Sequence, residues 1–424
     1  MDTYSILHKI VKGSFSIAYK QIKYVNLDKI PKDGAIIFAP NHTSALMDAL
    51  AILSLSKKPI SFVARADIFK NKHLAKILTY LRLIPIMRIR DGYDQLKKND
   101  KTIQKSVEIL ESGIPLNVFP EGAHKDKHSL MRLLKGIFRI AIKAQVELGN
   151  KMPVYIVPVS ITYGNFYKYR SSLRAEILDP INIKDYIAKL DQDPLSPKSM
   201  NTLKDLLYDR MKEGLLYIEN DEYYDAKYDL CALMVEDKKL SYADLFKKNK
   251  ESLAKLEKRS DIFLNAKEFS ELRKNSGISL KSIIRNNGII SIITKCLLLI
   301  ISLPYAIFAN IINSPISILT KLAIKALKND RVFNNSIRFV LNLILWPIIV
   351  IICSAILFAI LHWGIALALS IIMVIPANQF ALFYNRQLRL TISDIKYLSN
   401  KKLRNIVSSL KSNIYENSSF SRIV

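Results

Sequence analysis

Residues 34–50 read GAIIFAPNHTSALMDAL and contain a strand-like run, a polar turn and a helix-like run in succession. Short apolar runs bounded by turn residues are typical of buried strands, and apolar residues spaced three and four apart are typical of helices. We therefore expect a strand over 34–39 and a helix over 45–54, with Ser44 as its N-terminal cap.

The same alternation continues to about residue 180. Further strand candidates are 60–64, 115–119 and 154–161, and further helix candidates are 72–81, 94–112 and 130–148. Strands that alternate with helices predict an α/β fold with a largely parallel sheet flanked by helices. We place this domain at 23–190, because the polar stretch DQDPLSPKS (191–199) has the composition of a linker.

The composition narrows the class of partner. Half of the 424 residues are hydrophobic and the formal net charge is +26, which favours nucleic acid, anionic lipid headgroups or phosphorylated substrates. The three cysteines have no short spacing, so we expect neither a disulfide framework nor a metal site. Without zinc-type spacing or an aromatic-interleaved basic signature, a nucleic-acid partner is not expected.

Two segments outside the α/β domain have helical patterns. Residues 1–22 form an amphipathic pattern that predicts a helix, either at the edge of the domain or lying on a membrane surface. Residues 200–285 are charged and lack strand signals, so we expect a helical connector between the α/β domain and the C-terminal region.

The C-terminal region has a membrane pattern. No Asp, Glu, Lys or Arg occurs from Phe339 to Asn385. Because a transmembrane helix needs ~20 apolar residues, we expect two such helices within 336–385, with LHWG (361–364) as the turn between them.

A third apolar segment, 289–320, is interrupted by Pro304 and again by Asn313–Pro315. We expect it to be re-entrant or to lie in the membrane plane; the alternative is a full crossing, which would place the following basic loop outside. Short basic loops remain cytoplasmic. The chain is thus expected to be a multi-pass membrane protein with its N-terminal domain and its basic tail, 386–424, on the cytoplasmic side.

His42 and Asp48 stand at the first strand-to-helix junction. A histidine at the end of a strand is suited to general-base catalysis when a carboxylate orients its ring and stabilises the imidazolium. Taken alone, the pair is better explained by capping and solvation at the start of a helix.

Basic residues follow the next strand-like run. Arg88 and Arg90 end the apolar part of PIMRIRDG (85–92). Guanidinium groups bind phosphate through two parallel hydrogen bonds. Without other evidence, however, the two arginines are an ordinary basic surface.

The stretch NVFPEGAHKDKH (117–128) leaves an apolar run through a turn. Gly122 would permit close approach of the backbone to a ligand. Glu121 could accept a hydrogen bond from a polyol, and the basic residues from His124 onward could hold a phosphate. Lys135 follows at the start of an apolar helix. A solvated turn explains the stretch equally well.

Taken in order, these motifs resemble the glycerolipid acyltransferase family, which includes the glycerol-3-phosphate and lysophosphatidate acyltransferases. The family has an Asn-His-x4-Asp motif, a second motif that ends in arginine, then Phe-Pro-Glu-Gly and an apolar Val-x-Pro-Val-like strand. The counterparts here are NHTSALMD (41–48), PIMR (85–88), FPEG (119–122) and VPV (157–159). The resemblance covers residues 23 to about 183.

The resemblance implies roles for these positions. His42 would be the general base, with Asp48 as its partner, and Arg88 would bind the acceptor phosphate. The candidate substrate-binding residues are Asn41, Arg88, Arg90, Glu121, Gly122, His124 and Lys135.

The departures from the family pattern bear on the substrate. Five residues instead of four separate His42 from Asp48, and Ala123 and His124 follow the FPEG motif where Thr-Arg is common. The wider spacing is similar to that of the fungal-type glycerol-3-phosphate/dihydroxyacetone-phosphate acyltransferases. It implies transfer to the sn-1 hydroxyl of glycerol 3-phosphate or to dihydroxyacetone phosphate, in phospholipid biosynthesis.

Alternatives to this reaction are sn-2 acylation of lysophosphatidate, acylation of a headgroup that lacks phosphate, and a non-catalytic membrane protein that binds anionic lipid or nucleic acid. The donor would be acyl-CoA or acyl carrier protein, with no cofactor and no acyl-enzyme intermediate. The sequence leaves the oligomeric state open.

Overall fold

The structure is a computed structural model that describes residues 3–56, 59–87, 99–234, 250, 254, 260–327 and 329–416. The chain divides into two compact units. The first consists of Met1–Tyr217 together with Arg331–Ser336, and the second of Ile218–Asp330 and Ile337–Val424.

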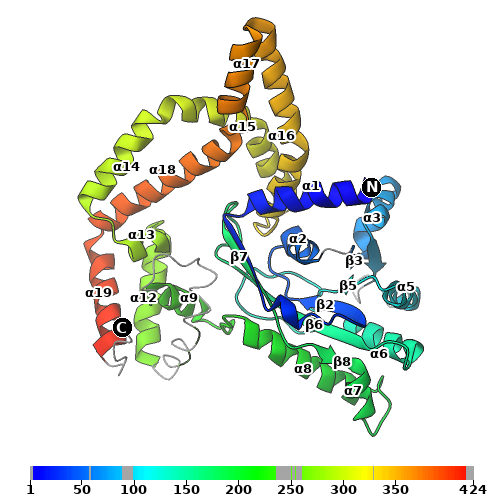
Figure 1. The fold of residues 1–424 in the computed structure, drawn as a ribbon. Coiled ribbons are helices and arrows are strands. Elements are labelled where there is room, and N and C mark those ends of the chain that lie inside the picture. Colours follow the sequence, from blue (N-terminus) through cyan, green and yellow to red (C-terminus); the bar gives the residue numbers. More distant parts are fainter. Residues whose placement is uncertain are drawn as a thin grey trace. The chain divides into compact units, whose positions relative to one another are not determined.

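A sheet of eight strands within the described residues forms the centre of the first unit (Figure 1). Its order is β1-β7-β6-β2-β5-β3-β4, with β8 beside β6. Only β6–β7 and β6–β8 are antiparallel among the described pairs, which confirms the expected largely parallel sheet. The strands are β1 (Gln21–Val25), β2 (Ala35–Pro40), β3 (Ser61–Arg65), β4 (Leu83–Ile86), β5 (Leu116–Asn117), β6 (Val154–Tyr163), β7 (Ser172–Ile177) and β8 (Ile181–Asn182).

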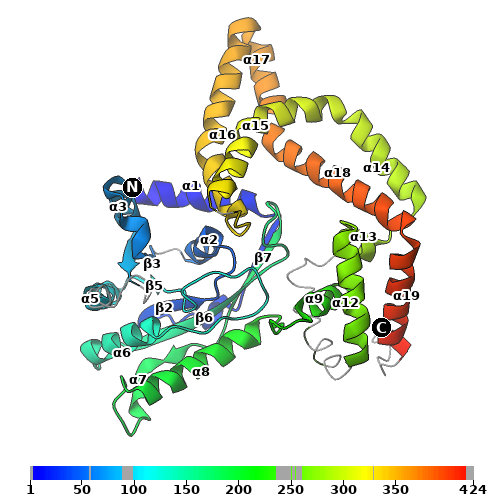
Figure 2. The same cartoon turned by 180° about the vertical axis from the view of Figure 1, so that it is seen from behind.

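Helices cover both faces of this sheet, with α1 and α2 on one face and α6 and α8 on the other (Figures 1 and 2). The core contains fully buried apolar residues of β2, β6 and α6, such as Ile37, Ile156 and Phe138. The helices of this unit are α1 (Thr3–Ala18), α2 (Leu46–Leu55), α3 (Lys72–Tyr80), α5 (Asn99–Glu111), α6 (Gly136–Leu148), α7 (Ile183–Ala188) and α8 (Pro197–Gly214), with 3-10 turns η1 (Leu27–Lys29) and η2 (Ala66–Phe69).

The first unit continues beyond the boundary expected at residue 190. In α8, the buried Leu203, Leu207 and Met211 pack into the same core as the sheet. The polar stretch 191–199 therefore begins a helix instead of linking two domains, because the Ser196 side chain accepts the Ser199 amide and Pro197 occupies the first turn. The connector expected over 200–285 accordingly starts inside the α/β unit. At the other end, α1 stops at Ala18 and β1 follows, so the helix expected over 1–22 is shorter.

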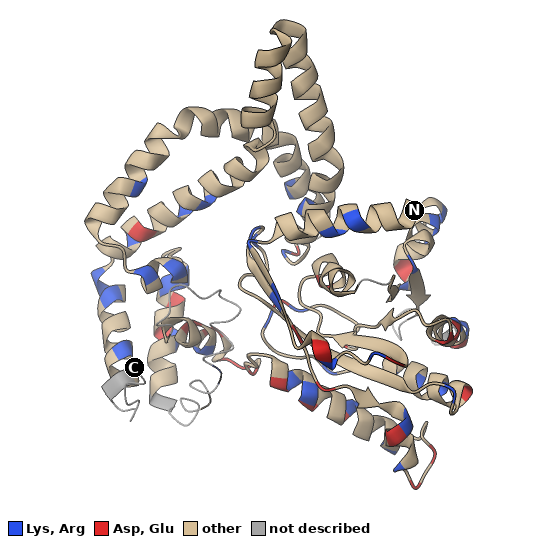
Figure 3. Cartoon of the chain, in the orientation of Figure 1, with Lys and Arg blue, Asp and Glu red and all other residues tan. Residues whose placement is uncertain are grey.

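The second unit is helical throughout its described elements. Three segments are long and apolar enough to cross a membrane: Leu303–Ala326, Phe333–Ile360 and Trp363–Ser399. Charged residues are almost absent from α16 and α17, which are nearly all tan in Figure 3. The helices are α9 (Tyr224–Leu233), α12 (Ser260–Asn275), α13 (Leu280–Arg285), α14 (Ile289–Ile301), α15 (Leu303–Ala326), α16 (Phe333–Ile360), α17 (Trp363–Leu369), the π-helical η4 (Ser370–Val374), α18 (Ala377–Ser399) and α19 (Lys401–Glu416).

The breaks in this region differ from those expected. Helix α15 passes through Asn313–Pro315 without interruption, and the break falls instead between α14 and α15, at Ser302. Pro304 lies in the first turn of α15, where its missing N–H costs no intrahelical hydrogen bond. Helix α18 runs on to Ser399, so the tail expected from residue 386 begins within a helix.

Candidate active site

His42 lies in the turn that follows β2. Its ring is hydrogen-bonded to Asp48, which is in the first turn of α2. The distance from His42 Nδ1 to Asp48 Oδ2 is 2.8 Å. A buried carboxylate with several donors around it is an acceptor, so Nδ1 carries the hydrogen and Nε2 has the free electron pair. The His42 side chain is 17% exposed, while that of Asp48 is fully buried. The imidazole is thus oriented as a base that substrate can reach.

Asp48 has three further donors besides His42. The amides of Thr43 and Ser44 donate to Oδ2 at 2.8 and 2.7 Å. The Tyr163 hydroxyl, at the end of β6, donates to Oδ1 at 2.6 Å. Burial and the neighbouring Asp48 carboxylate raise the pKa of Tyr163 well above its ordinary value, so this phenol remains protonated and donating. The carboxylate is therefore fixed in position.

Five residues separate His42 from Asp48, and the turn that they form has an unusual backbone conformation at Ala45. This residue has φ 48° and ψ −122° at the N-terminal cap of α2, a backbone region that normally requires glycine. Ser44 does not provide the expected cap, and its hydroxyl has no hydrogen-bond partner among the described residues. The Asp48 carboxylate instead accepts the amides of Thr43 and Ser44, which precede the cap, and so fixes the turn ahead of the helix.

Phe119 and Glu121 bring the FPEG turn against His42. The rings of Phe119 and His42 are stacked, with centroids 4.1 Å apart. Glu121 accepts the amide of His42 at one oxygen and that of Met131 at the other, both at 2.8 Å. Burial raises the pKa of Glu121 to about 7, although both amides oppose the shift. Each carboxylate oxygen accepts one backbone amide, so Glu121 joins the turn at His42 to the loop at Met131, and its expected hydrogen bond to a substrate hydroxyl stays a prediction.

Asn41 has a structural role, while its expected substrate contact stays a prediction. Its side-chain amide donates to the Ile161 carbonyl at 3.0 Å and accepts the Ile161 amide at 2.6 Å. The side chain is buried and extends the pairing of β2 with β6 by one step. Asn41 thereby holds the ends of the two strands that carry His42 and Tyr163.

Gly122 and His124 lie on the same loop. Gly122 has φ 64°, a left-handed conformation that favours glycine, and a Cβ atom there would also require the end of the exposed Leu134 side chain to move. The ring centroids of His124 and His42 are 5.6 Å apart. The Lys125 amide donates to the His42 carbonyl, which brings the basic stretch beside the catalytic turn.

Comparisons with known proteins match this region. A family model described as Acyltransferase matches residues 21–162. A chloroplast 1-acyl-sn-glycerol-3-phosphate acyltransferase of Arabidopsis thaliana is 28% identical over 147 residues, which are 33% of this chain and 39% of that protein. A probable 1-acyl-sn-glycerol-3-phosphate acyltransferase of Mycoplasma pneumoniae is 23% identical over 202 residues, which are 46% of this chain and 70% of that protein.

The chain has an acyltransferase domain of the glycerolipid acyltransferase family. This confirms the family that the motifs predicted. The crystal structure of the 1-acyl-sn-glycerophosphate acyltransferase of Thermotoga maritima is 22% identical, with a TM-score of 0.37, and covers 50% of this chain and 77% of that one. The particular similarity to fungal-type enzymes stays a prediction. The match to the Arabidopsis protein spans about two fifths of its length.

Within the acyltransferase domain, the remaining predicted residues divide into two groups. Arg88 and Arg90 lie outside the described residues. Lys135 is half-buried and immediately precedes α6, while the amide of its neighbour Leu134 donates to the Pro120 carbonyl at 2.7 Å. Lys135 is therefore next in sequence to the residue whose amide links the start of α6 to the FPEG turn.

Two residues of the site were missed by sequence reasoning. Tyr163 lies just beyond the strand expected over 154–161 and was not singled out, although a buried phenol usually has a hydrogen-bond partner and was a usable signal. Phe333 contacts His124, with ring centroids 4.9 Å apart, and comes from the distant segment Arg331–Ser336. No local pattern points to it.

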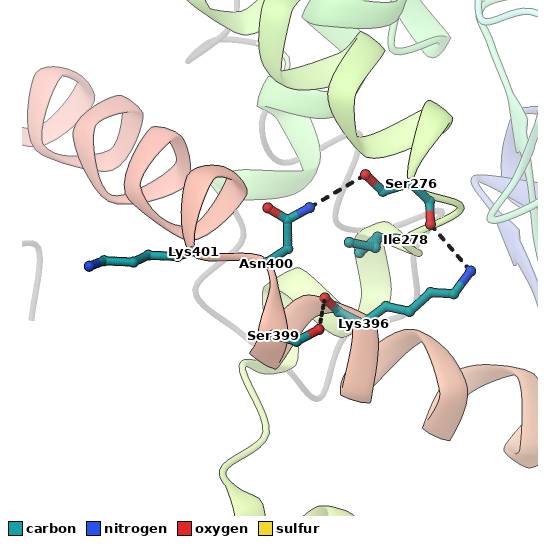
Figure 4. Close-up of a pocket in the computed structure, with 6 residues that line it drawn as sticks. All are labelled: Ser276, Ile278, Lys396, Ser399, Asn400 and Lys401. Carbon is teal, nitrogen blue, oxygen red and sulfur yellow. Dashed lines mark hydrogen bonds between the residues drawn. The ribbon is translucent and has the colours of Figure 1, made fainter.

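Other features of the described residues do not resemble a second catalytic site. No group of three or more His, Cys, Asp and Glu among them could hold a metal ion. Figure 4 shows a hollow of the second unit, in which Asn400 and Lys396 donate to Ser276. The hollow is lined by Ser276, Ile278, Lys396, Ser399, Asn400 and Lys401.

Proposed function

We propose that the chain transfers a fatty acyl group from a thioester donor to a hydroxyl group of a glycerol-phosphate acceptor. The observation that carries this proposal is the His42–Asp48 pair, in which a buried carboxylate with four hydrogen-bond donors orients a histidine whose side chain is still partly exposed. In the family to which the domain belongs, this pair is the catalytic motif.

The reaction requires few groups from the protein. His42 Nε2 removes the proton of the acceptor hydroxyl as its oxygen attacks the thioester carbonyl, and Asp48 stabilises the resulting imidazolium. The C–S bond of the tetrahedral intermediate then breaks, and the leaving thiolate takes the proton from the His42 imidazolium, which restores the neutral base. Because a thioester is already activated, neither an acyl-enzyme intermediate nor a cofactor is needed.

Cationic side chains would bind the acceptor phosphate. Lys125 is placed by its backbone hydrogen bond to His42, and Lys135 by its position beside the FPEG turn. We propose that Arg88 and Arg90 also bind the acceptor phosphate. The donor can be acyl-CoA or acyl carrier protein, both of which are anionic and compatible with the net charge of +26.

Two acceptors are supported by different observations. The five-residue spacing between His42 and Asp48 favours glycerol 3-phosphate, or dihydroxyacetone phosphate, with acylation at sn-1. The names of the relatives from Arabidopsis and Mycoplasma favour lysophosphatidate, with acylation at sn-2. The turn at Ala45 supports neither acceptor over the other, since it preserves the His42–Asp48 bond.

The test is thiol release from acyl-CoA by the purified full-length protein in lipid nanodiscs, with each acceptor offered separately. We expect release that depends on one glycerol-phosphate acceptor, glycerol 3-phosphate being our first candidate. A preference for lysophosphatidate would instead assign the reaction to acylation at sn-2. Binding to anionic vesicles or DNA without thiol release in the presence of either acceptor, or with acyl carrier protein as donor, would contradict the proposed function.

A further inference from the structure

The segment Arg331–Ser336 lies between two long apolar helices in the sequence but belongs to the unit that contains the acyltransferase domain. It ends the connection after α15, and its last four residues form the first turn of α16. A candidate membrane helix therefore begins inside the catalytic unit.

Side-chain hydrogen bonds hold this segment in place. The Asn335 amide group, which is buried, donates to the Phe166 carbonyl at 2.8 Å. Asn334 donates to the Tyr167 carbonyl at 2.7 Å, so two successive carbonyls of the loop after β6 are bonded to two successive asparagines. The Ser336 hydroxyl donates to the Ser44 carbonyl at 3.4 Å, in the turn that carries His42. Val332 is buried as well. These contacts fix the backbone on either side of Phe333.

Phe333 continues a row of rings that leads to the catalytic base. Its ring meets that of His124 edge to face, with a centroid separation of 4.9 Å and an interplanar angle of 86°. His124 meets His42 in the same manner at 5.6 Å, and the His42 ring stacks on Phe119 at 4.1 Å. Edge-to-face packing restricts the orientation of a ring. His124 is thus packed between Phe333 and His42.

We propose that Phe333 is a positioning residue of the active site, which holds His124 in the orientation that contacts the acceptor beside His42. The inference rests on the proposed function and deepens it. It makes acyl transfer depend on the start of α16, so that the catalytic domain and the membrane helix form one functional unit.

The experiment compares full-length variants in nanodiscs and measures kcat and the acceptor KM for acyl transfer. Phe333→Ala should raise the acceptor KM by ~10-fold while kcat and the donor KM change by less than about threefold, because the lost contact acts on acceptor binding through His124. Phe333→Tyr, which keeps the ring, should restore the wild-type KM. Phe358→Ala, at an exposed position near the other end of α16, is the matched control and should have no effect.

A double-mutant cycle tests whether the effect passes through His124. In a His124→Ala background, Phe333→Ala should cause no further change in KM, since interacting residues are not additive. The inference is overturned if wild-type protein is active while Phe333→Ala leaves KM unchanged, lowers kcat alone as a loss of folded enzyme would, or adds independently to His124→Ala. If the wild type releases no thiol with any acceptor, the proposed function fails instead.

Discussion

At the scale of single residues, Asp48 connects the base to the rest of the fold. One of its oxygens accepts hydrogen bonds from the His42 ring and from two backbone amides. The other accepts a hydrogen bond from the hydroxyl of Tyr163, which is 115 residues away in the sequence. A carboxylate with this many donors cannot rotate away from the imidazole. The orientation of His42 consequently depends on tertiary structure as well as on the local turn.

Tyr163→Phe removes one of these donors without changing the shape of the core. We expect kcat to fall by ~10-fold, because a hydrogen bond to a charged group contributes about 1.5–3 kcal/mol and part of it is lost from the positioned Asp48. Steady-state acyl transfer by the purified protein measures this. Tyr24→Phe is the control, since it removes a hydroxyl that donates to the Ala51 carbonyl away from His42. Equal turnover of Tyr163→Phe and wild type would show that Asp48 does not need this donor.

The raised pKa of Glu121 predicts that the stability of the fold depends on pH. Burial raises its pKa from 4.5 to about 7, so the folded state binds more protons than the unfolded state between these values. The free energy of unfolding contributed by Glu121 is therefore highest below pH ~4.5 and decreases up to pH ~7, by as much as about 1.4 kcal/mol per pH unit. Glu121→Gln should remove this component, as measured by thermal unfolding from pH 4.5 to 8.

The comparison must be made between variant and wild type at each pH. Burial lowers the pKa of His128 to about 4, which acts in the opposite direction over an overlapping range, so the wild-type curve is a sum of both. Glu111→Gln, at an exposed position of α5, is the control. Parallel curves for Glu121→Gln and wild type would contradict the assignment.

At the scale of elements, apolar runs predicted the central strands well. β2, β3 and β6 lie within one or two residues of the expected ranges, because buried parallel strands consist of continuous apolar residues. β1 was missed since it is an edge strand with exposed Gln21 and Lys23. The expected helix over 130–148 begins only at Gly136, because the preceding residues include Met131, whose amide donates to Glu121.

The candidate site was predictable only in part, for a physical reason. His42, Asp48, Glu121 and Gly122 belong to short motifs whose members meet through one turn. Phe333 and Ser336 reach the site through tertiary contacts, and Ser336 lies 292 residues from its partner Ser44. Residue type also did not indicate that the Asn41 side chain would form two hydrogen bonds with the backbone of Ile161.

The start of α2 provides a prediction at this scale. Ala45 adopts a conformation that is strained for a residue with a Cβ atom, so Ala45→Gly should leave the protein at least as stable, with a gain of about 1 kcal/mol. Ala51→Gly, inside the same helix, should lower the free energy of unfolding by about 1 kcal/mol or more. Denaturant unfolding of both variants provides the measurement. Loss of stability in Ala45→Gly as large as in Ala51→Gly would contradict the strain argument.

At the scale of the whole molecule, the location of Arg331–Ser336 constrains the membrane topology. Because this segment groups with residues 1–217 in one compact unit, we expect both to lie on the same side of the membrane. The intervening chain must cross the membrane an even number of times. Helix α14 has 13 residues, short of the ~20 that a span requires. Although α15 is long enough to cross, its crossing alone would separate the two parts of the catalytic unit. The re-entrant or in-plane arrangement of 289–320 therefore stays our prediction.

Cysteine labelling tests this topology. In a background that lacks Cys231, Cys296 and Cys353, we introduce either Lys325→Cys, after the apolar part of α15, or His362→Cys, at the turn between α16 and α17. With an impermeant maleimide on intact cells, His362→Cys should react, and Lys325→Cys should react only after permeabilisation. Reaction of Lys325→Cys in intact cells would contradict the predicted cytoplasmic location of the catalytic unit.

The central claim is that His42 is the base of an acyl-transfer reaction. The most direct measurement is acceptor-dependent thiol release by purified His42→Ala, compared with wild type and with His73→Ala, which changes an exposed histidine of α3. The account predicts that His42→Ala loses ~10²–10⁴-fold in turnover, as expected for removal of a general base, while remaining folded and bound to membranes. Turnover of His42→Ala close to that of wild type and His73→Ala would contradict it.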